Sequence, residues 1–210
     1  MACSAPPLES GVFASMGSPV EVQVHGDGAE ATRLVEEAFR EVEEEPEHPD
    51  LLVEAERLRI ATGGAFDVGW SGGVDVGGIA KGWALDKAGE RLRQEGFDNF
   101  CLSAGGQVLV QGGRDGAPWR VGIRQPGAPL HQPAAVLQLT EGSASTSGQY
   151  ERPGHIVDPS TTEPAPGGSA TVVHAQATDA DALSTALFVL GPKEGQVLAD
   201  ALGVEVYFFE

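Results

Sequence analysis

Segments with strand-like alternation and segments with helical spacing follow one another along this chain without a regular order. Residues 20–24 alternate apolar and polar side chains, which predicts a half-buried strand, whereas residues 29–45 carry apolar side chains at helical spacing. A steady strand–helix–strand rhythm would predict a parallel, doubly wound sheet, and the sequence lacks that rhythm. We therefore expect an α+β fold, formed by a single mixed α/β domain.

The same patterns predict the other elements. A second helix is expected to begin with Asp50 as its cap and to end at Gly63 and Gly64. Three more helices are expected over residues 79–94, from residue 179 or 180 to residue 190, and from residue 192 to residue 203. Strands are expected over residues 100–103, 107–110, 119–124, 135–139, 170–174 and 204–209.

The bulk properties restrict the classes of function. The 210 residues suit one domain, which we expect over residues 16–210 after a flexible leader at residues 1–15. The formal net charge of −18 argues against binding to nucleic acids or anionic membranes. No apolar run is long enough to span a membrane, so we do not expect an integral membrane protein. The two cysteines, Cys3 and Cys101, imply no disulfide scaffold.

The start of the chain bears on location. It carries neither a basic segment followed by an apolar run nor a lipoprotein processing motif. This predicts a cytoplasmic protein, or an extracytoplasmic one if the N-terminus has been processed.

A double glycine separates an apolar approach from a helix that carries a lysine in its first turn. Without a Cβ, Gly77 and Gly78 allow the backbone to approach a ligand closely and to adopt positive φ angles. The free N–H groups of the helix start and the charge of Lys81 suit a phosphate group. The pattern equally fits a plain strand-to-helix connection with a surface lysine. It matches neither a Walker A loop nor a GxGxxG fingerprint.

A second candidate site lies near residue 181. Asp181 and Thr185 are four residues apart on a predicted helix, hence on one face, and Ser184 lies beside them. A carboxylate with hydroxyl groups suits Mg²⁺, which prefers oxygen ligands and often keeps substrate phosphates in its shell. Residues 178–181 also fit the [S/T]-x-x-[D/E] capping pattern, in which Asp181 would only bind backbone N–H groups of its own helix. The spacing alone favours the cap over the metal site and leaves both interpretations open.

One histidine stands out. His155 follows Gly154 in a polar loop and is a candidate general base, although an exposed loop histidine is the commoner case. The histidines form no HxxxH or HExxH pattern and no CxxC is present, so a zinc site is not expected. Residues 145–148 are interpreted as a turn or a ligand-contact loop and not as a nucleophile elbow.

Together these motifs resemble the ApbE family, the FAD:protein FMN transferases. The resemblance is carried by VDVGGIAKGWALDKA at residues 74–88, STSGQYE at residues 145–151, HIVDP at residues 155–159 and ATDADALSTALFVLG at residues 177–191. Shorter matches, in the family's order, lie at residues 16–18, 64–67, 103–107 and 119–126. The resemblance implies an ApbE-like, T-fold-like domain.

The resemblance also implies an activity and a site. Family members bind FAD and Mg²⁺, transfer the FMN moiety to a threonine or serine hydroxyl of an acceptor protein, and release AMP. The implied metal ligands are the Gly78 carbonyl, Asp181, Thr185 and, as a weaker candidate, Ser184. The implied flavin contacts are Met16, Ala65, Phe66, Asp67, Asp75, Lys81, and His155 or Ile156. In this chemistry Lys81 and Mg²⁺ neutralise charge on the pyrophosphate, and His155 assists deprotonation of the acceptor hydroxyl.

The chain resembles a shortened family member. Family members carry a longer stretch between the first helix and the GAFD-like segment, with a tyrosine that contacts the flavin nucleotide, and here only residues 46–62 occupy that place. The stretch between Asp67 and Val74 is also short. The metal and phosphate half is intact, whereas part of the wall around FAD is missing. Two alternatives to the transferase follow: an FAD pyrophosphatase that yields FMN and AMP, and a non-catalytic flavin-binding or interaction module.

Overall fold

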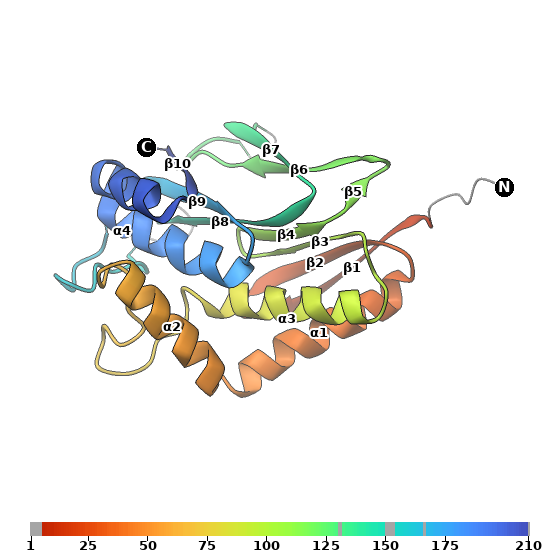
Figure 1. The fold of residues 1–210 in the computed structure, drawn as a ribbon, viewed down its shortest axis with the longest axis horizontal. Helices are drawn as coiled ribbons and strands as arrows, with labels where there is room; N and C mark the ends of the chain where they lie inside the picture. The colour runs from red at the N-terminus through yellow and green to blue at the C-terminus, as the bar shows by residue number, and fades with distance from the viewer. Residues whose placement is uncertain (1–5, 130–131, 150–153, 166, 210) are drawn as a thin grey trace.

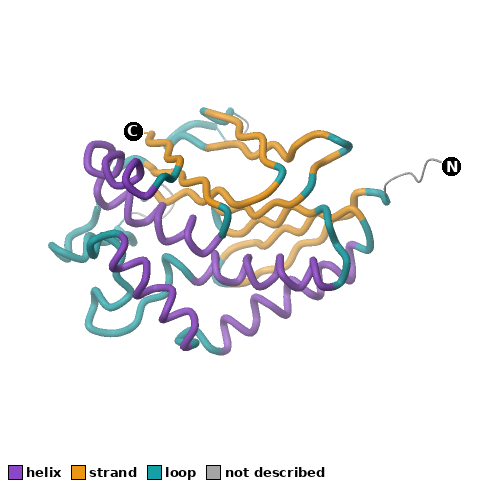
Figure 2. Tube along the Cα trace, viewed as in Figure 1, coloured by secondary structure: helices purple, strands orange, loops and turns teal. Residues whose placement is uncertain are grey.

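A seven-stranded sheet lies between a layer of helices and a smaller sheet in the computed structural model, which describes residues 6–129, 132–149, 154–165 and 167–209 (Figure 1). Figure 2 separates the helices, in purple, from the strands, in orange. The large sheet has the order β1-β2-β3-β4-β8-β9-β10, and every neighbouring pair is antiparallel. This mixed architecture confirms the predicted α+β fold.

The central strands of the large sheet have side chains packed on both of their faces. Their bounds are Leu8–Ser15 (β1), Ser18–His25 (β2), Phe100–Ala104 (β3), Gln107–Gln111 (β4), Glu141–Gly148 (β8), Ser169–His174 (β9) and Glu205–Phe209 (β10). Successive side chains point to opposite faces of a strand. In β3, Phe100 and Leu102 pack against the helices, whereas Cys101 packs against the smaller sheet.

The helices of the described chain lie on one side of this sheet. Their bounds are Gly28–Glu44 (α1), Pro49–Ala61 (α2), Ala80–Gln94 (α3) and Ala177–Leu202 (α4). The helix α4 is broken at Gly191, whose φ of 73° and ψ of 177° are not helical, and Pro192 starts its second segment. None of the described helices combines the length and apolar character that crossing a membrane requires.

The smaller sheet covers the opposite face. It consists of Gly113–Arg114 (β5), Ala117–Ile123 (β6) and Ala135–Leu139 (β7), in that order. Trp119 and Val121 of β6 form an apolar cluster with Val110 and Ala144 of the large sheet. The Trp119 indole N–H also donates a hydrogen bond to the Gln111 carbonyl at 3.0 Å, which ties the two sheets together.

The prediction of a flexible leader at residues 1–15 is wrong for residues 8–15. Residues 8–15 form β1, which pairs along its whole length with β2. Phe13 packs edge-on against Phe39 of α1, with ring centroids 5.8 Å apart. The strand therefore has a regular backbone partner and a core contact, although Val12 is exposed and no clean alternation predicts it. Cys3 lies outside the described residues.

Other local predictions are also wrong. The cap of α2 is His48, whose ring accepts the N–H of Asp50 at 3.1 Å, and Asp50 itself lies inside the first turn. Residues 145–148 are neither a turn nor a loop, because they form the end of β8 and pair with β9. The helix α4 begins at Ala177, two or three residues before the predicted start.

Candidate functional site

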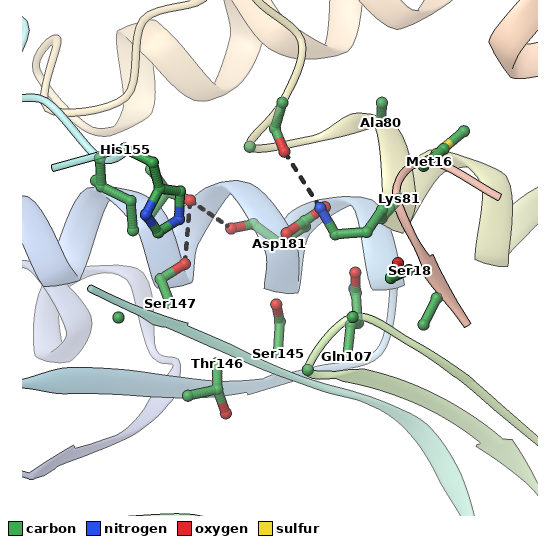
Figure 3. A pocket seen from close by; sticks show the side chains of 18 of the residues that line it. Met16, Ser18, Ala80, Lys81, Gln107, Ser145, Thr146, Ser147, His155 and Asp181 are labelled. Atoms are coloured by element: carbon green, nitrogen blue, oxygen red, sulfur yellow. Dashed lines mark hydrogen bonds between the residues drawn. The ribbon is translucent and has the colours of Figure 1, made fainter. Parts of the chain in front are cut away.

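A cleft of about 1130 Å³ opens between the start of α3, the first turns of α4, the end of β8 and the turns that join β1 to β2 and β3 to β4 (Figure 3). Almost all of the site residues proposed from the sequence line it: Met16, Ala65, Phe66, Asp67, Asp75, Gly78, Lys81, His155, Ile156, Asp181 and Thr185. Ser184 is fully buried behind the lining. The fold thus brings these residues together, and their binding roles stay predictions.

The double glycine permits close packing and does not adopt a left-handed backbone conformation. Neither Gly77 nor Gly78 has a positive φ, contrary to one of the two uses proposed from sequence. A Cβ on Gly78 would lie 3.1 Å from the Thr185 hydroxyl oxygen and 3.3 Å from the Phe66 ring. Glycine is therefore suited to this position because α4 approaches the turn closely.

At the start of α3, the N–H groups of Ile79 and Ala80 already donate to the Val76 carbonyl oxygen, at 3.0 Å and 2.9 Å, and are not the free donors expected from the sequence. Its cap residue, Ile79, makes no capping hydrogen bond with its side chain. The Asp75 carboxylate instead orders the preceding turn by accepting the N–H of Gly77 at 3.0 Å and the indole N–H of Trp70 at 3.3 Å. Two contacts of its carboxylate are thus internal, and its predicted contact with the flavin stays a prediction.

Lys81 reaches into the cleft from the first turn of α3. Its ammonium group donates a long hydrogen bond of 3.4 Å to the Gly77 carbonyl oxygen. Its stem lies against the β3–β4 turn, where a Cβ on Gly105 would be 3.3 Å from the Lys81 Cδ. Among the residues that the structure describes, none forms an ion pair with Lys81. An anion in the cleft would therefore meet an available positive charge.

Opposite Lys81, side chains of α4 and β8 form a cluster of oxygen atoms. We call Asp181, Ser184, Thr185 and Ser147 the oxygen cluster. The Ser147 hydroxyl lies 2.8 Å from the Ser184 hydroxyl and 3.2 Å from the Thr185 hydroxyl. Ser184 and Thr185 donate to the Asp181 carbonyl oxygen at 2.9 Å and 3.3 Å. One face of α4 and the end of β8 thus present hydroxyl and carboxylate oxygens together.

The Asp181 carboxylate is buried, with only 5% of the residue exposed. Burial raises its pKa, and the Lys81 charge, the Gly82 N–H and the Ser145 hydroxyl oppose that rise. The Gly82 N–H donates to Asp181 Oδ2 at 3.0 Å. A carboxylate held in such a place favours a positively charged partner, because a buried charge is costly when it stands alone.

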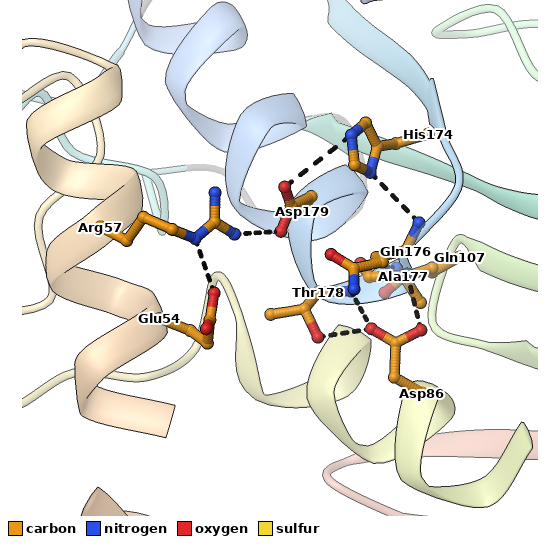
Figure 4. Close-up of polar contacts among 9 residues, drawn as sticks. All are labelled: Glu54, Arg57, Asp86, Gln107, His174, Gln176, Ala177, Thr178 and Asp179. Atoms are coloured by element: carbon orange, nitrogen blue, oxygen red, sulfur yellow. Dashed lines mark hydrogen bonds and ion pairs between the residues drawn. The ribbon is translucent and has the colours of Figure 1, made fainter. Parts of the chain in front are cut away.

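Asp181 is not the cap of its own helix. The capping pattern at residues 178–181 predicted that Asp181 binds N–H groups at the start of α4. Those N–H groups are bound by Asp86 of α3 instead (Figure 4), and the N–H that Asp181 accepts belongs to Gly82 of α3. The capping interpretation is therefore wrong in this form.

His155 lies at the rim of the cleft, on an exposed loop. The Gln149 side-chain amide supports this loop, because its Nε2 donates to the carbonyl oxygens of Ile156 at 3.0 Å and Ala165 at 2.7 Å. Gly154 donates its N–H to the Gln149 Oε1. The loop thus has defined internal support, and the proposed role of His155 as a base stays a prediction.

Sequence reasoning missed several residues of the cleft. Ser147 joins the oxygen cluster, and Gln107, which is 1% exposed, lines the cleft with an Oε1 atom that has no hydrogen-bond partner among the described residues. The Ser18 hydroxyl, beside Gly105, is another such atom. Polar residues at the ends of β2, β4 and β8 carried this signal, but only strand pairing brings them together.

The donor set fits a hard cation. The described residues hold no cluster of three or more histidine, cysteine or acidic side chains suited to a metal. The oxygen cluster supplies one buried carboxylate and neutral hydroxyl oxygens, and Gly78 lies against Thr185. Such a partial oxygen shell suits Mg²⁺, which usually keeps waters and substrate phosphates among its ligands.

Comparison with solved structures shows the same fold. A mutant of the flavin transferase ApbE from Vibrio cholerae superposes with a TM-score of 0.83 at 22% identity, over 96% of this chain and 93% of that chain. The apo form of the Pseudomonas stutzeri flavinyl transferase ApbE gives 0.81 at 23% identity, over 99% and 92%. The Thermotoga maritima ApbE protein gives 0.82 at 23% identity, over 96% and 94%.

Comparison of sequences shows a family relationship. The FAD:protein FMN transferase of Vibrio cholerae is 33% identical in an alignment of 144 residues, gaps included, that covers 63% of this chain and 43% of that protein. The FAD:protein FMN transferase of Treponema pallidum is 36% identical in an alignment of 155 residues that covers 64% of this chain and 43% of that protein. The match thus spans less than half the length of these relatives. The profile of the ApbE family matches residues 69–208, well over half of the chain, and this chain therefore belongs to the ApbE family.

Proposed function

We propose that this chain transfers the FMN moiety of FAD to a threonine or serine hydroxyl of an acceptor protein, in an Mg²⁺-dependent reaction that releases AMP. The observation that carries the proposal is the oxygen cluster around Asp181, which shares one cleft with the ammonium group of Lys81. The cleft volume of about 1130 Å³ is near the upper end of the roughly 300–1,000 Å³ of ordinary ligand pockets, which leaves room for a dinucleotide. The names of the related enzymes support the same activity.

The proposed step is an attack of the acceptor hydroxyl oxygen on the FMN-side phosphorus of FAD. A new P–O bond forms to the acceptor, the pyrophosphate P–O bond breaks, and AMP leaves with the bridging oxygen. Lys81 would hold the pyrophosphate and neutralise charge that develops on it. His155, at the cleft rim, would accept the proton of the acceptor hydroxyl.

The Asp181 carboxylate, the Thr185 hydroxyl and the Gly78 carbonyl would hold Mg²⁺. The chemistry that Mg²⁺ supplies when bound is charge neutralisation at the pyrophosphate. Ser147 would orient the Thr185 hydroxyl from behind through their contact of 3.2 Å, and Ser184 would hold Ser147 in place through the hydroxyl contact of 2.8 Å.

The test is a reaction of the chain with FAD, Mg²⁺ and the acceptor protein of the Vibrio cholerae relative. We expect a covalently flavinylated acceptor in intact mass spectra, and one AMP for each flavin transferred. Asp181→Ala is expected to abolish the reaction. Lys87→Met is the control, because Lys87 stacks on Trp83, with its Nζ 4.8 Å from the ring centroid, and does not line this cleft.

The products separate the alternatives. Free FMN and AMP without a labelled acceptor indicate a pyrophosphatase. FAD binding without products indicates a binding module, and either result rejects the transferase.

The cytoplasmic location stays a prediction, which cell fractionation checks.

A further inference from the structure

The first turn of α4 is capped by a residue of another helix. The residue at its N-cap, Gln176, makes no capping hydrogen bond with its side chain. The Asp86 carboxylate of α3 accepts the N–H of Ala177 at 2.9 Å, the N–H of Thr178 at 2.8 Å and the Thr178 hydroxyl at 2.6 Å. Three donors at the start of α4 thus depend on one side chain that lies more than 90 residues earlier in the sequence (Figure 4).

The two helices exchange such contacts. Asp86 of α3 binds the start of α4, and one turn earlier on α3 the N–H of Gly82 binds Asp181 of α4 at 3.0 Å. Gly82 and Asp86 are four residues apart on α3, and Thr178 and Asp181 are three apart on α4, so each pair shares one face of its helix. The crossed carboxylate contacts therefore fix the helices against both sliding and rotation.

Two further contacts hold the first turn of α4 in place. The Gln107 side chain of β4 donates from Nε2 to the Ala177 carbonyl oxygen at 2.6 Å. A Cβ on Gly82 would lie 2.3 Å from that same oxygen, so the helices are in close contact there. The beginning of α4 is thus fixed from α3 and from the sheet, one turn before Asp181.

The neighbouring ionic contacts do not fix the start of α4 against α3. Asp179 pairs with Arg57 of α2 and lies 3.8 Å from the His174 ring (Figure 4). These contacts join α4 to α2 and β9, neither of which contributes to the contact between Asp181 and Gly82. Asp86, unlike Asp179, links the start of α4 to the helix bearing Gly82 and Lys81.

We propose that Asp86 is a positioning residue for the cation site: by capping α4 from α3, it sets the register at which Asp181 and Thr185 face Gly78 and Lys81. The inference rests on the proposed function, because it assumes that the oxygen cluster binds Mg²⁺. Asp86 touches neither the cation nor FAD in this proposal and acts through α4. Residues that orient metal ligands from behind typically change metal affinity by about 10–100-fold when removed.

The experiment compares two caps. Asp86→Ala removes the cap of α4, and Asp27→Ala removes the equivalent cap of α1, where Asp27 accepts the N–H groups of Ala29 at 3.1 Å and Glu30 at 3.0 Å. Mg²⁺ is titrated calorimetrically into the full chain, with and without FAD, and thermal unfolding is followed in parallel. We expect both variants to lose stability, but only Asp86→Ala to bind Mg²⁺ about 10–100-fold more weakly.

A second pair keeps the test valid if Asp86→Ala does not fold. Thr178→Val removes the hydroxyl donor to Asp86 and is expected to weaken Mg²⁺ binding, whereas Thr178→Ser retains the donor and is expected to bind like the wild type. Equal Mg²⁺ affinity of Asp86→Ala and Asp27→Ala, or of the two Thr178 variants, would overturn the role of Asp86 and leave the proposed function standing. A wild-type chain that binds no Mg²⁺ would reject the cation site itself, and this inference with it.

Discussion

The Asp181 carboxylate accepts the backbone N–H of Gly82, across 99 residues of sequence, at a distance of 3.0 Å. Gly82 follows Lys81 in α3, the helix that starts just after the double glycine, and Asp181 belongs to the oxygen cluster. The proposed anion-binding part and the proposed cation-binding part of the candidate site are therefore one unit, and neither is complete until α3 and α4 have packed.

Gly82→Ala should be a severe substitution. The added Cβ would lie 2.3 Å from the Ala177 carbonyl oxygen and 2.8 Å from the Thr178 Cα, and backbone atoms cannot move aside without separating the helices. We expect a loss of about 1–3 kcal/mol or more in urea unfolding. Gly89→Ala is the matched control in the same helix, because its nearest contact is the flexible Leu109 side chain at 2.9 Å. Equal stability of the two variants would contradict the close contact.

Lys81→Met should weaken FAD binding and leave the fold intact. The ammonium group has one long contact of 3.4 Å to a carbonyl, and its charge opposes the rise in the pKa of Asp181, so its removal should lower the stability of the free protein without unfolding it. Hydrogen bonds to charged groups contribute about 1.5–3 kcal/mol, which corresponds to roughly 10–100-fold in affinity. Fluorescence titration with FAD measures the change, and Lys87→Met is expected to bind FAD like the wild type. An unchanged affinity of Lys81→Met would remove Lys81 from the site.

Asp181→Asn should stabilise the metal-free chain at neutral pH while it abolishes Mg²⁺ binding. Burial raises the pKa of Asp181, so the folded chain loses stability as pH rises from the unfolded-state pKa towards the higher folded-state pKa. Asparagine carries no charge and keeps an oxygen for the Gly82 N–H. Thermal unfolding in EDTA should favour the variant at neutral pH and show a smaller difference in acid. A less stable variant at neutral pH would contradict the cost of this buried charge.

Cys101 should be unreactive while the chain is folded. Burial raises the pKa of its thiol to about 12, and the thiolate is the reactive species. In a Cys3→Ser background we expect no reaction with a thiol reagent at mildly alkaline pH, and full reaction in urea. Because the folded state retains the proton, the contribution of Cys101 to stability should decrease above about pH 8.5, the ordinary thiol pKa. Rapid labelling of the folded chain would show that Cys101 is accessible.

Side-chain periodicity was sufficient to predict the elements with a strong apolar pattern. The strand expected at residues 20–24 and the helix expected at residues 29–45 are confirmed as β2 and α1. The strand β8 had no such pattern, because residues 143–148 are small and mostly polar and obtain their structure by pairing with β4 and β9. The edge strand β1 was missed for a similar reason, since its pairing with β2 is not encoded in its own alternation.

The candidate site was predictable only in part. The family motifs indicated which residues gather in the cleft, because each motif carries its own polar side chains. The contacts of Asp86 and Gln107 with the start of α4 could not be predicted, since they join residues 91 and 70 positions apart through the packing of α4 against α3 and β4. Spacing along one helix favoured Asp181 as a local cap, and tertiary packing gave that cap to Asp86.

The break in α4 at Gly191 divides the helix into two segments. The segment before it carries Asp181 and Thr185, whereas the segment after it packs on β10, where a Cβ on Gly195 would lie 2.8 Å from the Phe208 ring. The same Cβ would lie 2.9 Å from the Leu187 carbonyl oxygen, so the second segment also packs closely on the first. Through this one small residue, the far edge of the sheet is in contact with the segment that aligns the oxygen atoms in the cleft.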